Sequence, residues 1–98
     1  MIDLGRVTGF DWDQGNIDKS YRKHGISVKE SEELFLDENI LFIDDIKHSQ
    51  EEQRFIAIGK TLEDKILFAV FGFRKDKIRI ISARPANKKE IKQYEEKL

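Results

Sequence analysis

Three arginines in the second half of the sequence occupy positions where a cation is costly unless it binds an anion. Arg54 opens an apolar run, Arg79 interrupts another, and Arg84 ends that second run directly before Pro85, the only proline. A half-buried guanidinium must be paired with a carboxylate or directed at a ligand such as phosphate, whose oxygens it can contact in pairs. The arginines therefore predict an anion site, with salt bridges to the abundant carboxylates as the structural alternative.

Strand geometry complicates a site shared by Arg79 and Arg84. The two residues are five positions apart, and side chains five positions apart face opposite sides of a regular strand. A bend between Ser82 and Arg84 would re-aim one of them, so a common face depends on an irregularity in this strand.

The two histidines are candidates for proton transfer. His24 is expected at the C-terminal end of a helix, where its charged form is favoured, so it could contact a phosphate or donate a proton. His48 lies in a polar connection between two apolar runs and could act as a general acid or base. Each could equally be an ordinary surface histidine.

Metal and disulfide chemistry are not indicated. The sequence has no cysteine, which removes disulfides and thiolate metal sites and favours an intracellular location. Oxygen and imidazole ligands do cluster in one segment, at Asp44, Asp45, His48, Glu51 and Glu52. Their spacing matches no metal motif, so we predict neither a metal nor another cofactor.

Charge is distributed unevenly along the chain, although the net charge is −1. Residues 1–71 hold 9 Lys/Arg and 15 Asp/Glu, whereas residues 72–98 hold 9 Lys/Arg and 4 Asp/Glu. A local cationic surface can attract phosphates even on a nearly neutral protein. The alternative is a solvated helix of mixed charge.

The chain is expected to form one small domain spanning residues 1–98, since 98 residues suffice for a single core. Hydrophobic residues make up 39% and charged residues 38%, which favours a folded chain with a densely ionic surface. No apolar run approaches the roughly 18 to 20 residues of a membrane span, and the start lacks a signal-peptide pattern. These features predict a cytoplasmic protein.

The elements that must position these residues indicate an α+β fold. Residues 9–13 suit a short edge strand or extended arm, and two short helices are expected at 16–24, before Gly25, and at about 27–36. Short turn-like segments separate four apolar runs, which predict antiparallel strands at 40–45, 54–61, 65–73 and 77–83. A last helix follows Asn87. The prediction is thus a small antiparallel sheet of four to five strands, with the third apolar run central.

Four segments in this order resemble the BrnT family of bacterial toxins: FDWD, RKHGIS, DDIKHSQEEQRFIAIGKT and KIRIISARPANKKEIKQYE. Together they extend over about residues 9–96, and the combination is specific although each segment alone would be weak. Ser20 and Pro85 depart from the pattern expected of relatives. Neither departure removes a candidate catalytic group.

The resemblance implies a small ribonuclease with a fold similar to the RelE-like mRNA interferases. Such an enzyme cleaves RNA without a metal, because the 2′-hydroxyl attacks the adjacent phosphorus. Arg79 and Arg84 would then stabilise the charge that develops on the phosphate, with Arg54 contributing from a neighbouring strand.

The resemblance also implies roles for other side chains. Proton transfer would fall to His48 or His24, while Tyr94 on the last helix would assist the leaving group or stack on a base. The residues expected to bind the RNA backbone are Lys23, Lys88, Lys89 and Lys92.

A partner is implied as well: a cognate antitoxin, expected to be a BrnA-like ribbon-helix-helix protein that forms a heterotetramer with the toxin and alone contacts DNA. Trp12 could anchor this partner or could belong to the core. A rival hypothesis is a non-catalytic interaction module whose arginines bind only carboxylates, of this chain or of a partner.

Overall fold

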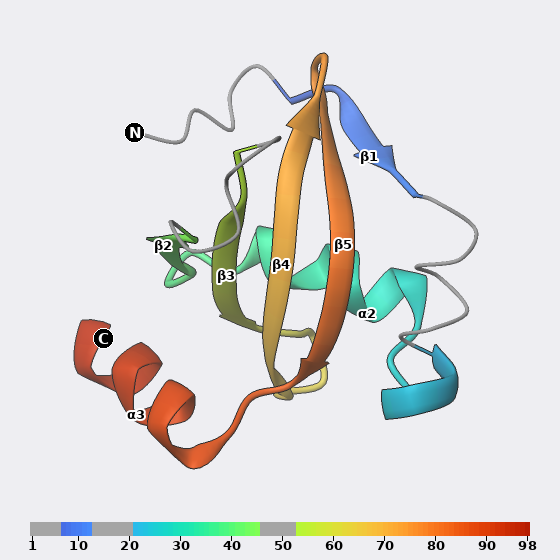
Figure 1. Ribbon diagram of the computed structural model, residues 1–98. Coiled ribbons are helices and arrows are strands. Elements are labelled where there is room, and N and C mark those ends of the chain that lie inside the picture. The colour runs from blue at the N-terminus through green and yellow to red at the C-terminus, as the bar shows by residue number, and fades with distance from the viewer. Residues whose placement is uncertain (1–6, 13–20, 46–52) are drawn as a thin grey trace.

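The computed structural model describes residues 7–12, 21–45 and 53–98 of the chain. Its strands form one sheet in the order β1-β5-β4-β3-β2, with β4 in the centre (Figure 1). The strands are β1 (Gly9–Asp11), β2 (Leu41–Asp44), β3 (Phe55–Lys60), β4 (Ile66–Arg74) and β5 (Lys77–Pro85). The predicted α+β class and central third run are therefore confirmed.

The connections explain the pairing. β2, β3, β4 and β5 form an antiparallel meander, as the short turns between apolar runs predict. The segment at 9–11 is an edge strand, as one of the two interpretations of its sequence had it, and it pairs in parallel with β5. The sheet is consequently mixed, with one parallel pair at its β1 edge.

The first predicted helix is described only at its C-terminal end. Residues 21–24 are helical, and the Gly25 N–H donates to the carbonyl of Tyr21 at 2.8 Å. Gly25 has a φ of 68°, the left-handed conformation that glycine adopts readily, so the helix ends where the sequence predicts. The earlier part of the predicted helix, 16–20, lies outside the described residues.

The second predicted helix consists of α2 (Val28–Glu33) followed by one turn of 3₁₀-helix, η2 (Leu34–Leu36). Ser27 caps α2, since its hydroxyl accepts from the Glu30 N–H at 3.1 Å and the Glu30 carboxylate accepts from the Ser27 N–H at 3.2 Å. This capping box confirms the predicted start of the helix.

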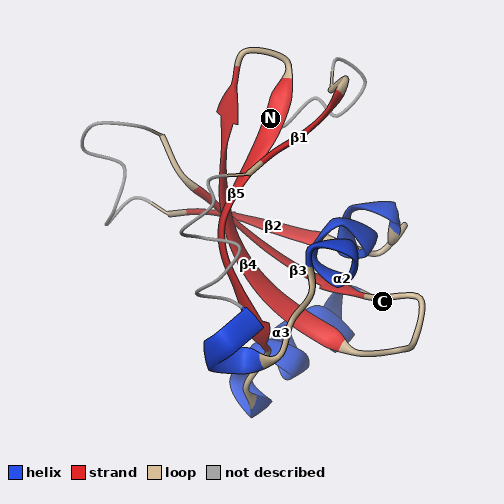
Figure 2. Cartoon of the chain, turned by 90° about the vertical axis from the view of Figure 1, so that its right-hand side faces the viewer, coloured by secondary structure: helices blue, strands red, loops and turns tan. Residues whose placement is uncertain are grey.

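The main core lies between the sheet and the α2–η2 segment, which crosses behind the strands in Figure 1 and to one side of them in Figure 2. Leu34 is completely buried, and the neighbouring Phe35 ring packs edge-on against Phe71 of β4 with centroids 5.1 Å apart. Alternate residues of β4 and β5, among them Leu67, Ala69, Phe71, Ile78 and Ile80, supply the sheet side of this core.

The last helix, α3 (Lys88–Lys97), lies at the lower end of the sheet in Figure 1. Asn87 caps it through a second capping box with Glu90, as the sequence predicts. Tyr94 turns into the protein and is 2% exposed. No helix in the described parts of the chain is long and apolar enough to cross a membrane.

Candidate active site

A bulge in β5 brings Arg79 and Arg84 to the same face of the sheet. Val70 pairs with Ser82 and Phe71 pairs with Ile80, so Ile81 is an extra residue without a partner on β4. On each side of the bulge, successive side chains still alternate between the two faces of the sheet. The extra residue shifts this alternation by one position, so Arg79 and Arg84 point to the same face. The irregularity that their spacing requires is thus present, at Ile81 rather than between Ser82 and Arg84.

Arg54 belongs to this face as well. Phe55 points into the core and pairs with Phe71, so the preceding residue, Arg54, faces the other side of the sheet. If the pairing of β3 with β4 is extended by one residue, Arg54 lies opposite Gly72. Gly72 pairs in turn with Arg79 on β5. We call the side of the sheet that carries Arg54, Arg79 and Arg84 the arginine face.

The arginine face contains a row of charged residues across the sheet, with an aspartate at each edge and the two arginines between them. The Asp45 N–H donates to the Arg54 carbonyl at 3.0 Å on one edge, and Asp11 pairs with Arg79 on the other edge. Between the two arginines lies Gly72, which contributes no side chain. Since neighbouring strands are about 4.8 Å apart, the Cα atoms of Arg54 and Arg79 are separated by about 10 Å.

Arg84 lies further along the same face and is held in place. Its guanidinium makes two bonds to the Glu90 carboxylate, at 2.8 and 2.7 Å, and stacks 4.0 Å from the centroid of the Phe68 ring. Phe68 is four residues before Gly72, so Arg84 lies about 13 Å along the strand from the Arg54–Arg79 row. The salt bridge that the sequence left as an alternative is therefore present for Arg84.

Glu90 connects this arginine to the last helix. Burial alone would raise the pKa of Glu90, but the bonds from Arg84 and from the Asn87 N–H outweigh it and lower the pKa. The carboxylate thus stays ionised, caps α3 and fixes Arg84 at once.

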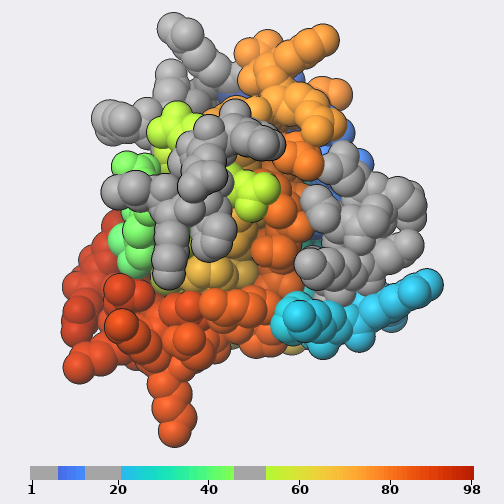
Figure 3. All heavy atoms as spheres, in the orientation of Figure 1, coloured from blue at the N-terminus to red at the C-terminus, as the bar shows by residue number. Residues whose placement is uncertain are grey.

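The predicted RNA-binding lysines are exposed. Lys23 lies in the last described turn of the first helix, and Lys88, Lys89 and Lys92 lie on α3. Figure 3 shows the atoms of β5 and α3, in orange and red, side by side at the lower end of the side opposite α2. The three lysines of α3 accordingly extend the basic surface beyond Arg84.

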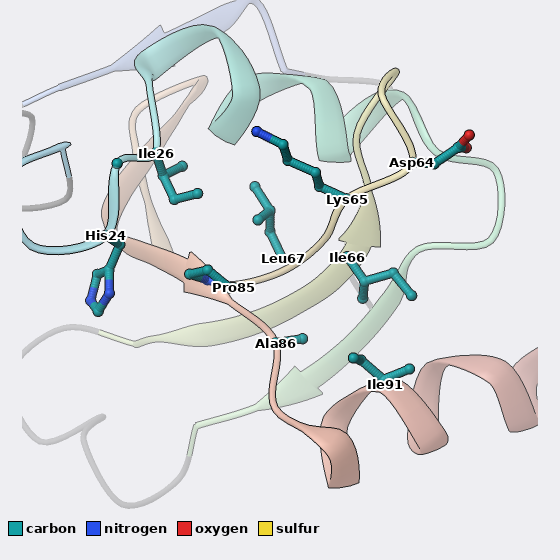
Figure 4. A pocket seen from close by; sticks show the side chains of 10 residues that line it. His24, Ile26, Asp64, Lys65, Ile66, Leu67, Pro85, Ala86 and Ile91 are labelled. Carbon is teal, nitrogen blue, oxygen red and sulfur yellow. The ribbon is translucent and has the colours of Figure 1, made fainter.

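His24 lies away from the Arg54–Arg79 row. It lines an open cavity of about 450 Å³ together with Pro85 and Ala86, the residues that directly follow Arg84 (Figure 4). The cavity floor is apolar and includes Leu67 and Ile91. The structure thus groups His24 with the Arg84 end of β5.

Tyr94 is bonded to Asp37, in the connection between η2 and β2. Its hydroxyl donates to Asp37 Oδ2 at 2.5 Å, and the same oxygen accepts from the Lys60 N–H at 2.9 Å. Burial, followed by the bond to Asp37, raises the pKa of Tyr94 to about 12. Through Asp37, the Tyr94 hydroxyl thus connects α3 to the β2–β3 edge of the sheet.

Tyr94→Phe should lower stability while leaving RNA cleavage almost unchanged. Removing the hydroxyl deletes one charge-assisted bond and leaves Asp37 with its backbone donors, so the expected loss is about 1–2 kcal/mol. Urea unfolding and a cleavage assay on the same preparation measure both effects. A stable Tyr94→Phe variant that has lost cleavage would instead assign Tyr94 to the chemistry.

Trp12 is half-buried and packs against the main core, and its indole N–H donates to Glu32 Oε2 at 3.0 Å.

His48 lies outside the described residues, as do Glu51 and Glu52. Within the described residues, no three His, Cys, Asp or Glu side chains are grouped so that they could hold a metal ion.

Sequence reasoning did not single out Gly72, Phe68 or Asp37. Gly72 interrupts the apolar third run, and a glycine inside a strand is a recognised sign of close approach by another group. Phe68 and Asp37 carry no such signal, because their roles depend on cross-strand register and on the path of α3.

Comparison with protein families identifies the chain. The model of the ribonuclease toxin BrnT, of type II toxin–antitoxin systems, matches residues 12–90. The chain belongs to the BrnT family. As a member it is a ribonuclease toxin of a type II system, and such a toxin implies a cognate antitoxin.

A solved structure shares the fold of this BrnT family member. The ribonuclease toxin BrnT of Brucella abortus superimposes with a TM-score of 0.61 and 19% sequence identity, over 82% of this chain and 97% of that one. A comparison with curated proteins gave no match. The family resemblance that the sequence segments indicate is therefore confirmed.

Proposed function

We propose that this toxin cleaves RNA at the arginine face, with the scissile phosphate over Gly72 between Arg54 and Arg79. The observation that carries the proposal is the register that puts these two arginines on either side of a residue without a side chain. Two guanidinium groups directed at one phosphate from opposite sides can each donate to its non-bridging oxygens.

The chemistry follows from this placement. The 2′-hydroxyl of the preceding ribose attacks phosphorus and loses its proton to a base, while the bond from phosphorus to the 5′-oxygen breaks and that oxygen gains a proton. The products are a 2′,3′-cyclic phosphate and a free 5′-hydroxyl. Negative charge accumulates on the phosphoryl oxygens as the fifth bond forms, and Arg54 and Arg79 would stabilise it there.

The rest of the RNA would follow β5 toward α3. Arg84 lies about 13 Å from the Arg54–Arg79 row and, held by Glu90, would contact the RNA backbone at a phosphate further along the strand from the scissile one. The lysines of α3, Lys88, Lys89 and Lys92, continue the positive surface in the same direction. Contacts to backbone phosphates of this kind position a strand without reading its sequence.

His48 is the proposed proton-transfer residue, because its segment connects Asp45 to Arg54 and so begins and ends beside the row. His24 lies beside Pro85, at the other end of β5. We expect His48→Ala to lower the cleavage rate by about 100-fold and His24→Ala to have a much smaller effect. Rates of the two variants across pH 5–9 test this, and equal effects would remove the assignment.

Cleavage should continue in the presence of a chelator. The proposal assigns charge stabilisation to arginine side chains, so no divalent cation has to be bound during the reaction. Incubation of purified toxin with RNA and excess chelator, followed by analysis of the product ends, is the test. Loss of activity that added magnesium restores would contradict a metal-independent mechanism.

The antitoxin is proposed to be a BrnA-like ribbon-helix-helix protein that covers the arginine face and blocks RNA. Burying the cations there requires acidic or hydrogen-bonding groups from the partner, because an unpaired buried charge costs several kcal/mol. Growth arrest on expressing the toxin, relieved by co-expressing the neighbouring gene, tests this arrangement. Harmless expression of the folded chain would contradict it.

A further inference from the structure

Two leucines are exposed on the opposite end of β3 from Arg54. Leu36 ends η2 and Leu62 lies in the turn between β3 and β4, and both are 71% exposed. Together they line one open cavity of about 420 Å³. A pair of large apolar side chains brought to one exposed hollow is a feature of protein-binding surfaces.

The loops that carry the leucines are fixed to each other. The Leu62 N–H donates to Glu33 Oε1 at 3.1 Å, and the Lys60 N–H donates to Asp37 Oδ2 at 2.9 Å. Within the turn, Thr61 is 4% exposed and its hydroxyl accepts from the N–H groups of residues 63 and 65. The leucines are thus presented on a preorganised surface, which lowers the entropic cost of binding.

The hollow is strongly acidic. The charged residues that line it are one cation, Lys60, and four carboxylates, Glu33, Asp37, Glu38 and Asp64. Figure 4 shows the Asp64 carboxylate pointing away from the His24 cavity, toward the outside of the β3–β4 turn. We call Leu36, Leu62 and these four carboxylates the leucine–acid surface.

The leucine–acid surface is separate from the arginine face. Arg54 precedes β3 and Lys60 ends it, so the two residues are six positions, or about 20 Å of strand, apart. Its negative charge would also repel an RNA backbone. A ligand of this surface is therefore expected to be something other than the RNA substrate.

We infer that the leucine–acid surface docks a basic, amphipathic segment of the cognate antitoxin. An apolar side chain would fill the hollow between Leu36 and Leu62, while flanking lysines or arginines would pair with the carboxylates. Two copies of this chain that meet through the same surface are disfavoured, since like charges would face each other. The antitoxin would then hold the toxin at two surfaces of opposite charge, and the inference requires a cognate antitoxin but not the proposed RNA site.

The test is the affinity of the purified toxin for the antitoxin encoded beside it. Leu36→Ala/Leu62→Ala should weaken binding by about tenfold or more, and Glu38→Lys should weaken it and reduce its dependence on salt. The matched control is Tyr21→Ala/Leu98→Ala, which removes two side chains that are each 63% exposed elsewhere. All variants should arrest growth like the unaltered toxin when expressed alone.

Three results would overturn the inference. One is an affinity for antitoxin that the leucine variant changes by less than about twofold. Another is a free toxin that dimerises and becomes monomeric in the leucine variant, which would assign the surface to a second copy. The third is a folded leucine variant with reduced RNA cleavage or toxicity, which would assign the surface to RNA or the ribosome.

Discussion

Arg79→Ala is expected to reduce RNA cleavage by about 100-fold or more while the protein remains folded. Arg79 faces away from the main core and lies beside Gly72, where the proposal places the scissile phosphate. Removing one donor from a developing oxyanion typically costs about 10²–10³ in rate. Arg54→Ala should have a comparable effect, because it faces the same position from the other side.

Two controls make the Arg79 experiment specific. Arg79→Lys keeps the charge but loses the forked donors, so it should recover only part of the rate. Lys29→Ala removes an exposed cation from α2, on the other side of the sheet from the arginine face, and should leave cleavage nearly intact. Normal cleavage by folded Arg79→Ala, or an equal loss in Lys29→Ala, would refute the assignment. Circular dichroism confirms folding in each case.

Arg84→Ala should lower both stability and cleavage, and a second substitution should separate the two effects. The change leaves the Glu90 carboxylate without its bidentate partner, at an expected cost of about 1–3 kcal/mol. Arg84 is about one-third exposed, with 35% of its side chain accessible, so solvent screening favours the lower part of that range. Cleavage should fall by about tenfold from the loss of a backbone contact.

The double variant Arg84→Ala/Glu90→Ala removes both charges. Its loss of stability should be smaller than the summed losses of the two single variants, because no carboxylate is left unpaired. Its cleavage rate should remain low. A double variant that regains both stability and cleavage would show that Arg84 serves only to anchor α3.

The sequence predicts most of the fold because local signals agree with it. The four apolar runs, the capping boxes at Ser27 and Asn87, and the helix end at Gly25 each have a local physical cause. The parallel pairing of β1 with β5 joins residues almost 70 positions apart. The pattern of apolar residues within one strand does not show which distant strand it will pair with.

The candidate site was predictable in its residue types but not in its geometry. Arg54, Arg79 and Arg84 stand out because guanidinium groups interrupt or border apolar strands. Their common face depends on Ile81 being a bulge, and the alternation of side chains alone predicts the opposite. The partner of Arg84 likewise depends on how α3 returns to the sheet, because that path brings Glu90, whose carboxylate also accepts from the Asn87 N–H, to the Arg84 guanidinium.

The most direct test of the proposed site is the structure of the toxin bound to a substrate RNA with a 2′-deoxy ribose at the cleavage position. That nucleotide lacks the attacking hydroxyl, so the complex cannot react. The proposal predicts a phosphate over Gly72, with oxygens within about 3 Å of the guanidinium nitrogens of Arg54 and Arg79. A scissile phosphate bound on α3, in the His24 cavity or on the α2 side of the sheet would contradict it.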